Sequence, residues 1–294
     1  MKKLLLILAL GLLTMGQDCD KTDPEPPPPP PDPVSEYCYG NDYSVLQAAL
    51  HQDAKGEEVG LFGGKESILH GDPSTDPRAT VYVAFGSSYC TGVALSPTIV
   101  LTAGHCGYGS DTAHAVYTFS RDQSGALHTD QRFGVKKHVV HPDYLKYVYS
   151  GNRDMEARKA DLMLLFLEEP LPDSYLRVAG FYDSKFAKFC RGMVAQGFGR
   201  HETPGRDLRE TKYVITQVTD KYLISRAAEV PPGEEAGRIC FGDSGGPLYA
   251  DVGGVPYLAG VTTTTMSSDC ERGGTHVRLT PFIDWIIETI KVNQ

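Results

Sequence analysis

Residues 238–249, RICFGDSGGPLY, place one serine, Ser244, on an unusually permissive backbone. A serine hydroxyl is a weak nucleophile at neutral pH. It needs an adjacent base, an acid that orients the base, and backbone N–H donors for the developing oxyanion. Gly242 allows the chain to turn so that its amide faces inward, and Gly245 and Gly246 allow substrate and backbone to approach closely. The stretch suits a nucleophile loop, although such a turn alone is more often only a turn.

The candidate base is His105, which lies at the end of the apolar run VLTAGHC (100–106). A single histidine is more often structural than catalytic, and the sequence contains nine. The assignment therefore depends on whether a nucleophile and an orienting acid accompany it.

The candidate acid is Asp161, at the head of the apolar run ADLMLLFL (160–167). A carboxylate at the start of such a strand is half-buried and must find a partner, because an unpaired buried charge is costly. Asp154 is the second candidate, but it lies in the polar stretch GNRDMEARK (151–159).

Composition and charge exclude several classes of protein. The 294 residues are 41% hydrophobic and 22% charged, as in ordinary globular proteins. The net charge of −9 is concentrated in residues 17–67, which carry eleven acidic residues and three lysines, whereas residues 68–294 carry only −3. With no basic stripe, nucleic acid is not an expected partner. No cysteine pair has C-x-x-C spacing and no cluster of residues argues for a metal, so we expect neither a metal nor a cofactor.

The N-terminal part of the chain indicates export. Residues 1–16, MKKLLLILALGLLTMG, have two lysines and a short apolar run, which is typical of a secretory signal peptide. Residues 17–67 form an acidic, proline-rich spacer and propeptide. Within it, the polyproline stretch 24–33 would reach roughly 30 Å.

From Ile68 onward, short apolar runs alternate with turn residues, which predicts an all-β barrel or sandwich. Residues 280–294 instead predict a helix, with Thr280 as its cap and Pro281 in its first turn. Its apolar side comprises Ile283, Ile286, Ile287 and Ile290.

Three motifs, LTAGHC (101–106), ADLMLLFL and GDSGGP (242–247), occur in that order and resemble the chymotrypsin/trypsin-like serine endopeptidases. The resemblance extends from about Ile68 to the C-terminal helix. It implies two six-stranded antiparallel β-barrels, roughly residues 68–175 and 176–279, followed by the helix 280–294. HPDY at 141–144 matches a surface loop of the family.

The resemblance also implies the roles of the site residues. His105 would be the general base, Asp161 its orienting acid and Ser244 the nucleophile of an acyl-enzyme mechanism. The amides of Gly242 and Ser244 would form the oxyanion hole. A catalytically inactive, protease-like binding module is the alternative. A lipase or esterase fits less well, because its nucleophile would lie in a G-x-S-x-G elbow.

Seven cysteines in an exported chain predict disulfides with one cysteine left over. The resemblance implies two family bridges and a third that tethers the propeptide to the inter-barrel linker: Cys90–Cys106, Cys240–Cys270 and Cys38–Cys190. Cys38 and Cys190 could otherwise be free thiols. Cys19 directly follows the apolar run, where a bacterial lipoprotein carries its lipid, although GQD before it is a poor lipobox. The signal peptide would extend to residue 18 if Cys19 is lipidated.

Family members are activated by cleavage that frees a new N-terminus. Here ILHG (68–71) occupies the corresponding place, so the resemblance implies that the Ile68 ammonium pairs with Asp243. Ser67 precedes Ile68, whereas activation sites usually have Arg or Lys. Lys65 is then the expected first cut, with trimming afterwards.

The residue six before the nucleophile lies at the base of the specificity pocket in trypsin-like enzymes, and here it is Arg238. A cationic floor repels Arg and Lys side chains, so tryptic specificity is not expected. Thr263 and Thr265 belong to the pocket wall, and Thr265 should narrow the entrance. His276 lies in the back wall.

Two specificities remain open. If Arg238 points into the pocket, acidic residues are favoured before the scissile bond, with His276 as a second donor. If Arg238 turns away, small apolar residues are favoured. Glu234 and Glu235 are close enough in sequence to neutralise Arg238.

These features predict an exported, monomeric serine endopeptidase, made as a zymogen, that acts on proteins or peptides and needs an activating protease. It would lie outside the cell or in the cell envelope. It would contact a membrane only through a lipid on Cys19.

Overall fold

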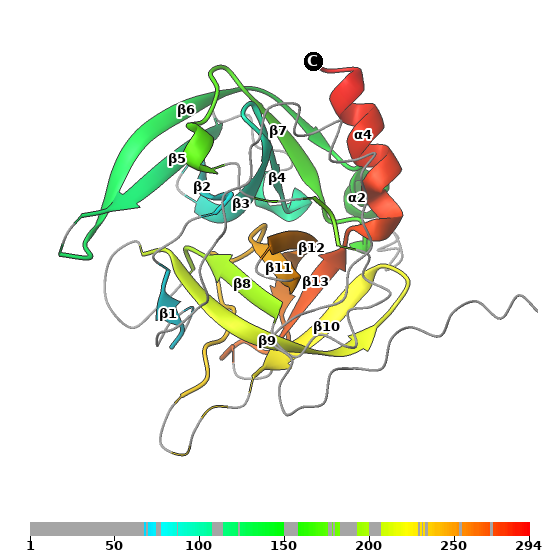
Figure 1. The fold of residues 1–294 in the computed structure, drawn as a ribbon. Helices are drawn as coiled ribbons and strands as arrows, with labels where there is room; N and C mark the ends of the chain where they lie inside the picture. Colours follow the sequence, from blue (N-terminus) through cyan, green and yellow to red (C-terminus); the bar gives the residue numbers. More distant parts are fainter. Residues whose placement is uncertain are drawn as a thin grey trace, which may run out of the picture. The chain divides into compact units, whose positions relative to one another are not determined.

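The computed structural model consists mainly of β-strands arranged as two barrels, with short helices at the periphery (Figure 1). The structure describes residues 68, 70–74, 78–86, 88–107, 114–122, 124–149, 158–175, 178, 180–182, 193–199, 207–228, 230, 232, 235–252, 255–270 and 273–294.

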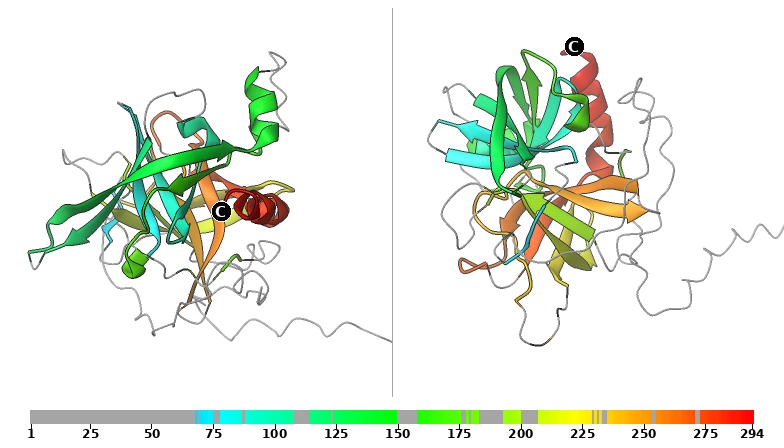
Figure 2. Two further views of the ribbon diagram at one scale, coloured as in Figure 1. Left: turned by 90° about the horizontal axis from the view of Figure 1, so that it is seen from above. Right: turned by 60° about the vertical axis from the view of Figure 1, so that its left-hand side comes forward.

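The first barrel is closed by six antiparallel strands in the order β2-β3-β4-β7-β6-β5. Its strands are β2 (Thr80–Phe85), β3 (Ser88–Ser96), β4 (Ile99–Thr102), β5 (His114–Arg121), β6 (Leu127–Val140) and β7 (Met163–Leu167). All five residues of β7 are buried, so both faces of this strand are covered, which explains its uninterrupted apolar sequence. β5 and the exposed first half of β6 extend together as a long ribbon (Figure 2).

The second barrel is also closed and antiparallel, because β8 pairs with both β11 and β9. Its strands are β8 (Met193–Gly197), β9 (Arg209–Val218), β10 (Tyr222–Ala227), β11 (Pro247–Val252), β12 (Val255–Thr265) and β13 (Gly274–Arg278). The prediction of two six-stranded antiparallel barrels is therefore confirmed.

The C-terminal helix α4 (Ile283–Lys291) packs its apolar side into the main core, where Ile286 and Ile290 are buried. Thr280 does not cap this helix as predicted. Residues Thr280–Phe282 instead form a 3₁₀ turn, and neither this turn nor α4 has a side-chain cap.

The HPDY segment, predicted as a surface loop, begins the helix α2 (Pro142–Tyr149). His141, just before α2, packs against Trp285 of α4, with ring centroids 4.6 Å apart and ring planes inclined by 56°. Burial lowers the pKa of His141 to about 4, so this contact holds a neutral imidazole at neutral pH.

The segment after the proposed activation site packs on the second barrel. β1 (Asp72–Pro73) pairs with β9, and Ile68 is buried in the second-barrel core. The predicted first-barrel range began at residue 68, whereas the first strand of that barrel begins at Thr80.

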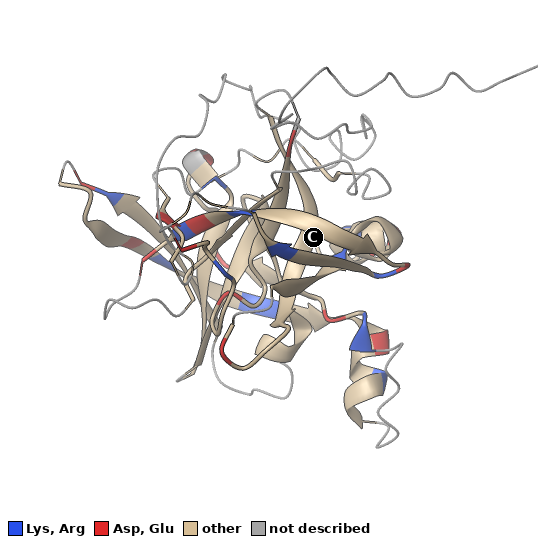
Figure 3. Cartoon of the chain, turned by 90° about the horizontal axis from the view of Figure 1, so that it is seen from below, with Lys and Arg blue, Asp and Glu red and all other residues tan. Residues whose placement is uncertain are grey.

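Charged residues of both signs are interspersed over the described part of the chain, without a continuous strip of one sign (Figure 3). Among the described residues, no helix combines the length and apolar character needed to cross a membrane.

Candidate active site

Strand pairing in the first barrel brings His105 and Asp161 together. β4 and β7 are antiparallel neighbours, with Thr102 opposite Met163. His105 follows β4 in the 3₁₀ turn Gly104–Cys106, and Asp161 lies two residues before β7. Two residues far apart in sequence therefore project from the same edge of the barrel.

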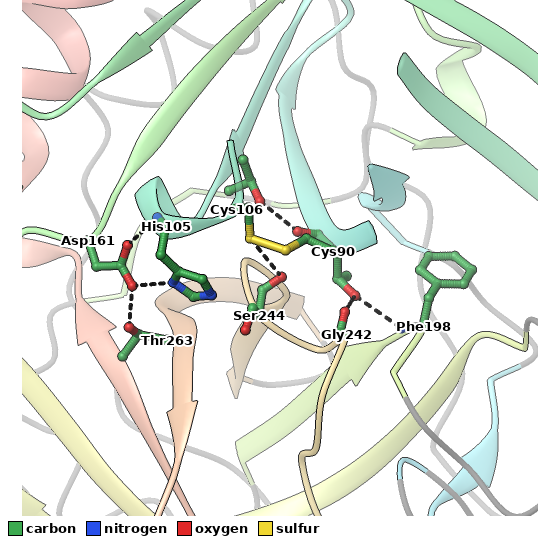
Figure 4. The surroundings of a disulfide bond; sticks show 10 residues. Cys90, His105, Cys106, Asp161, Phe198, Gly242, Ser244 and Thr263 are labelled. Carbon is green, nitrogen blue, oxygen red and sulfur yellow. Dashed lines mark hydrogen bonds and ion pairs between the residues drawn. A yellow bond between two sulfur atoms is a disulfide. The ribbon is translucent and has the colours of Figure 1, made fainter. Parts of the chain in front are cut away.

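Asp161 holds the histidine at two points. The backbone N–H of His105 donates to Oδ1 over 2.7 Å, and the His105 ring nitrogen Nδ1 lies 2.7 Å from Oδ2 (Figure 4). The hydroxyl of Thr263, from β12 of the second barrel, also donates to Oδ2. Thr263, which was predicted to line the specificity pocket, therefore also contacts the carboxylate that orients His105.

The environment of His105 makes it a stronger base. Burial alone would lower its pKa, but the charge of Asp161 and the hydrogen bond to it outweigh this effect and raise the pKa above its usual 6.5. Because Asp161 occupies Nδ1, the other ring nitrogen, Nε2, is the one that remains for Ser244. Among the described residues, no hydrogen bond yet joins the Ser244 hydroxyl to His105, although the ring faces Ser244 (Figure 4).

The loop that carries Ser244, the predicted nucleophile, is called the nucleophile loop below, and it contacts the first barrel. The N–H of Thr91, in β3, donates to the Ser244 carbonyl over 2.9 Å, and the Thr91 hydroxyl donates to the Gly242 carbonyl over 3.0 Å. Gly245 has φ +83°, and a Cβ there would lie 2.2 Å from the Thr91 carbonyl and 2.9 Å from the Ala103 nitrogen. Glycine is therefore required at residue 245 both for its backbone conformation and for the close approach of the two barrels.

Some backbone N–H groups of this loop donate hydrogen bonds within the described part of the chain, and others do not. The N–H groups of Asp243, Gly245 and Gly246 donate to backbone carbonyls. Within the described part of the chain, those of Gly242 and Ser244 donate to no other residue. Two N–H groups that donate no other hydrogen bond, beside a serine hydroxyl, are what an oxyanion hole needs.

Both disulfides predicted for the described residues are confirmed: Cys90–Cys106 and Cys240–Cys270. The first bridge ties the turn that carries His105 to β3, and Cys106 Sγ lies 3.9 Å from the Ser244 carbonyl oxygen. Cys90, His105 and Cys106 are close enough to resemble a metal cluster, but sulfurs in a disulfide offer no thiolate.

Asp243 is buried and accepts hydrogen bonds from the N–H groups of Cys240 and Gly199, each 2.8 Å long. Burial outweighs these two bonds and raises the pKa of Asp243 to about 7. The site predicted to receive an ammonium group therefore destabilises a negative charge in the uncut chain.

The predicted pocket residues have different surroundings. His276 is fully buried, with its ring nitrogens 2.8 Å from the Ser225 hydroxyl and 3.1 Å from the Thr262 hydroxyl, and burial lowers its pKa to about 3. Its imidazole is therefore neutral, and both ring nitrogens already have hydrogen-bond partners. This argues against the predicted role of His276 as a second donor for acidic substrates. Ile239 is buried beside Gly274, where a Cβ would lie 1.9 Å from the isoleucine side chain.

Arg238 is half-buried. The hydroxyl of Thr265, another predicted pocket residue, donates to the Ser267 carbonyl over 3.0 Å. Glu235, a predicted neutraliser of Arg238, lies with its Oε2 2.8 Å from Nδ1 of His70. Several residues of the predictions lie outside the described residues: Cys19, Cys38, Asp154, Cys190 and Glu234.

The site is thus a serine, a histidine and an aspartate contributed by two antiparallel six-stranded β-barrels, an arrangement that defines the trypsin-like class. The sequence model of the trypsin family matches residues 68–286, and the chain belongs to this family. Its trypsin-like domain is of the serine protease class, whose members act on proteins or peptides.

Proposed function

We propose that this protein is a secreted serine endopeptidase that uses Ser244, His105 and Asp161. The observation that carries the proposal is the Asp161 carboxylate, which orients His105 toward Ser244 while accepting a hydrogen bond from the second barrel. A binding module without activity would not need the raised pKa of His105 or the two uncommitted amides.

In the proposed mechanism, the Ser244 hydroxyl attacks the scissile carbonyl while His105 Nε2 takes its proton. The N–H groups of Gly242 and Ser244 stabilise the oxyanion. His105 then gives the proton to the leaving amine, and the acyl group remains as an ester on Ser244. Water attacks this ester with His105 again as base, which releases the acid and regenerates the hydroxyl.

Labelling with a fluorophosphonate probe, together with peptide hydrolysis, tests the proposal. Ser244→Ala and His105→Ala should each reduce kcat by about 10⁴- to 10⁶-fold with the fold intact. Asp161→Asn should lose less than Ser244→Ala, because a poorly oriented histidine remains. Unlabelled wild-type enzyme after activation would support the binding module, and a larger loss in Asp154→Asn would identify a different acid.

We further propose that the enzyme is made as a zymogen, cut before Ile68. Ile68 is 2% exposed in the second-barrel core, and the buried Asp243 acquires a cationic partner if that ammonium forms. N-terminal sequencing of active enzyme should read Ile-Leu-His-Gly. Full activity of a chain in which residues 17–67 are still attached would contradict this.

For specificity, we propose small apolar residues before the scissile bond, and no activity toward Arg or Lys. Ile239 packs against Gly274, and His276 is neutral and engaged, so neither supplies an anion site. Peptides with Ala, Glu, Phe and Arg at this position, compared by kcat/KM, test the proposal. A preference for Glu that disappears in Arg238→Ala would instead assign the pocket to acidic residues.

Export as a monomer to the cell envelope or exterior, with or without a lipid on Cys19, is part of the same proposal. It is supported by the signal-like residues 1–16 and the acidic spacer. Metabolic labelling with a palmitate analogue, lost in Cys19→Ala, would assign the lipid.

A further inference from the structure

His114, the first residue of β5, is buried without hydrogen bonds. Its exposed fraction is 5%, and neither Nδ1 nor Nε2 has a hydrogen-bond partner among the described residues. Buried polar atoms in native proteins almost always have partners, and leaving one unpaired costs about 1–3 kcal/mol. An imidazole with two such atoms requires a group that satisfies at least one of them.

A second imidazole lies beside it. His138, an exposed residue of β6, has its ring centroid 4.7 Å from that of His114, with an angle of 73° between the ring planes. Two imidazoles bound to one zinc ion, with bonds of about 2.1 Å, have centroids roughly 4.5–5.2 Å apart. The pair therefore has the separation of two ligands on one ion. Because His138 is exposed, its ring can rotate toward a shared ion without displacing core residues.

A second aromatic ring beside His114, the apolar ring of Phe85 at 4.7 Å between centroids, offers its nitrogens no hydrogen bond.

We propose that His114 and His138 bind one divalent transition-metal ion that favours imidazole, such as Zn²⁺, with water completing its coordination. Sequence alone gives no signal for this site, since the two histidines are 24 residues apart and lie on different strands. The site is separate from the catalytic residues and does not depend on proteolytic activity.

The ion would nevertheless lie close to the turn that carries His105. Phe85 packs against both His114 and Gly107, and a Cβ on Gly107 would lie 2.3 Å from the Phe85 ring. Gly107 is two residues after His105. An ion that fixes His114 would therefore also stabilise the part of the first barrel that packs against the turn carrying His105.

Zinc sulfate titrated into the full-length Ser244→Ala chain, followed by calorimetry, tests the site. We expect one ion bound with a rise in the unfolding temperature, and affinity at least tenfold weaker in His138→Gln. His128→Gln, which removes an exposed histidine elsewhere on β6, is the matched control and should leave this binding unchanged. His105→Gln in the same background should also retain it, which excludes zinc on the catalytic histidine.

His114→Phe provides a second variant with an apolar ring in place of the imidazole. It should lose zinc binding while its stability without metal is unchanged or increased, because two unpaired nitrogens are removed. If His114→Phe fails to fold, the His138→Gln comparison still decides. No zinc bound by the Ser244→Ala chain, or less than tenfold weakening in His138→Gln, would overturn the proposal.

Discussion

At the scale of single residues, Thr263 connects the two barrels at the candidate site. Its hydroxyl donates to Asp161 across 102 residues, and only the packing of β12 against the first barrel brings the two residues together.

Thr263 should therefore affect catalysis rather than binding. Thr263→Ala removes a hydrogen bond to a buried charge, so we expect kcat to fall about tenfold, equivalent to ~1.4 kcal/mol, with KM nearly unchanged. Thr263→Ser keeps the hydroxyl and should retain most of the activity. Steady-state kinetics on one peptide substrate measure both, and equal losses in the two variants would mean that the methyl group matters instead.

Local sequence predicts only part of this site. Ser244 and His105 lie in short motifs whose neighbouring glycines or apolar run identify them without knowledge of the fold. Thr263 lies in a run of four threonines, which gives no reason to connect it with Asp161.

The raised pKa of His105 predicts the acid limb of the pH profile. Only neutral His105 can accept the proton of Ser244, so kcat/KM should fall below a midpoint that lies above 6.5. In Asp161→Asn the charge that raises this pKa is lost, and the midpoint should move to lower pH. Profiles of kcat/KM between pH 5 and 9 measure it, and an unmoved midpoint would assign the limb to another group.

At the scale of elements, alternation of apolar and turn residues was sufficient to predict the strands, because each strand buries side chains against the same barrel core. The helix α2 was missed, although Pro142 at its first position and Asp143 in its first turn are ordinary helix-start signals. The pairing of β4 with β7, which positions His105 against Asp161, depends on contacts between segments about 60 residues apart.

The approach of the nucleophile loop to β3 and β4 leads to a prediction with a matched control. Gly245 and Gly125 both have left-handed backbones, with φ +83° and +82°, but a Cβ on Gly125 has nothing within 4 Å. Gly125→Ala should cost only the conformational strain, about 1–2 kcal/mol. Gly245→Ala adds a collision with the Thr91 backbone, so it should cost more stability and abolish most activity. Urea unfolding and peptide hydrolysis measure both, and similar losses in the two variants would show that the backbones can separate freely.

At the scale of the whole molecule, the segment around the proposed activation site belongs to the second barrel although the first barrel follows it in sequence. The Arg209 side chain donates to the Gly71 carbonyl over 3.4 Å, and Ser74 N–H donates to the Leu208 carbonyl over 2.9 Å. His70 adopts a left-handed backbone with φ 59° where its side chain meets Glu235. Such contacts join residues more than 130 positions apart, which is why local sequence patterns could not assign this segment to the second barrel.

Asp243 is buried in the uncut chain, so the free energy of unfolding should depend on whether its carboxyl group is protonated. The pKa of Asp243 rises from 3.8 to about 7 on folding, chiefly because of burial. Between about pH 4 and 7 the folded chain therefore holds a proton that the unfolded chain has lost. Since the unfolded state binds fewer protons there, stability falls as pH rises, by up to ~1.4 kcal/mol per pH unit from this group.

Urea unfolding of the uncut Ser244→Ala chain at pH 4.5, 5.5 and 6.5 measures the effect. Other carboxylates contribute their own slopes, so the comparison is with the same chain carrying Asp243→Asn, which keeps the shape but cannot ionise. Relative to Asp243→Asn, the uncut chain should lose stability at each step. In the chain cut before Ile68, an ammonium beside Asp243 would hold its carboxylate ionised, and the relative slope should disappear. A slope that persists after the cut would mean that the new N-terminus does not reach Asp243, and the proposed activation mechanism would be wrong.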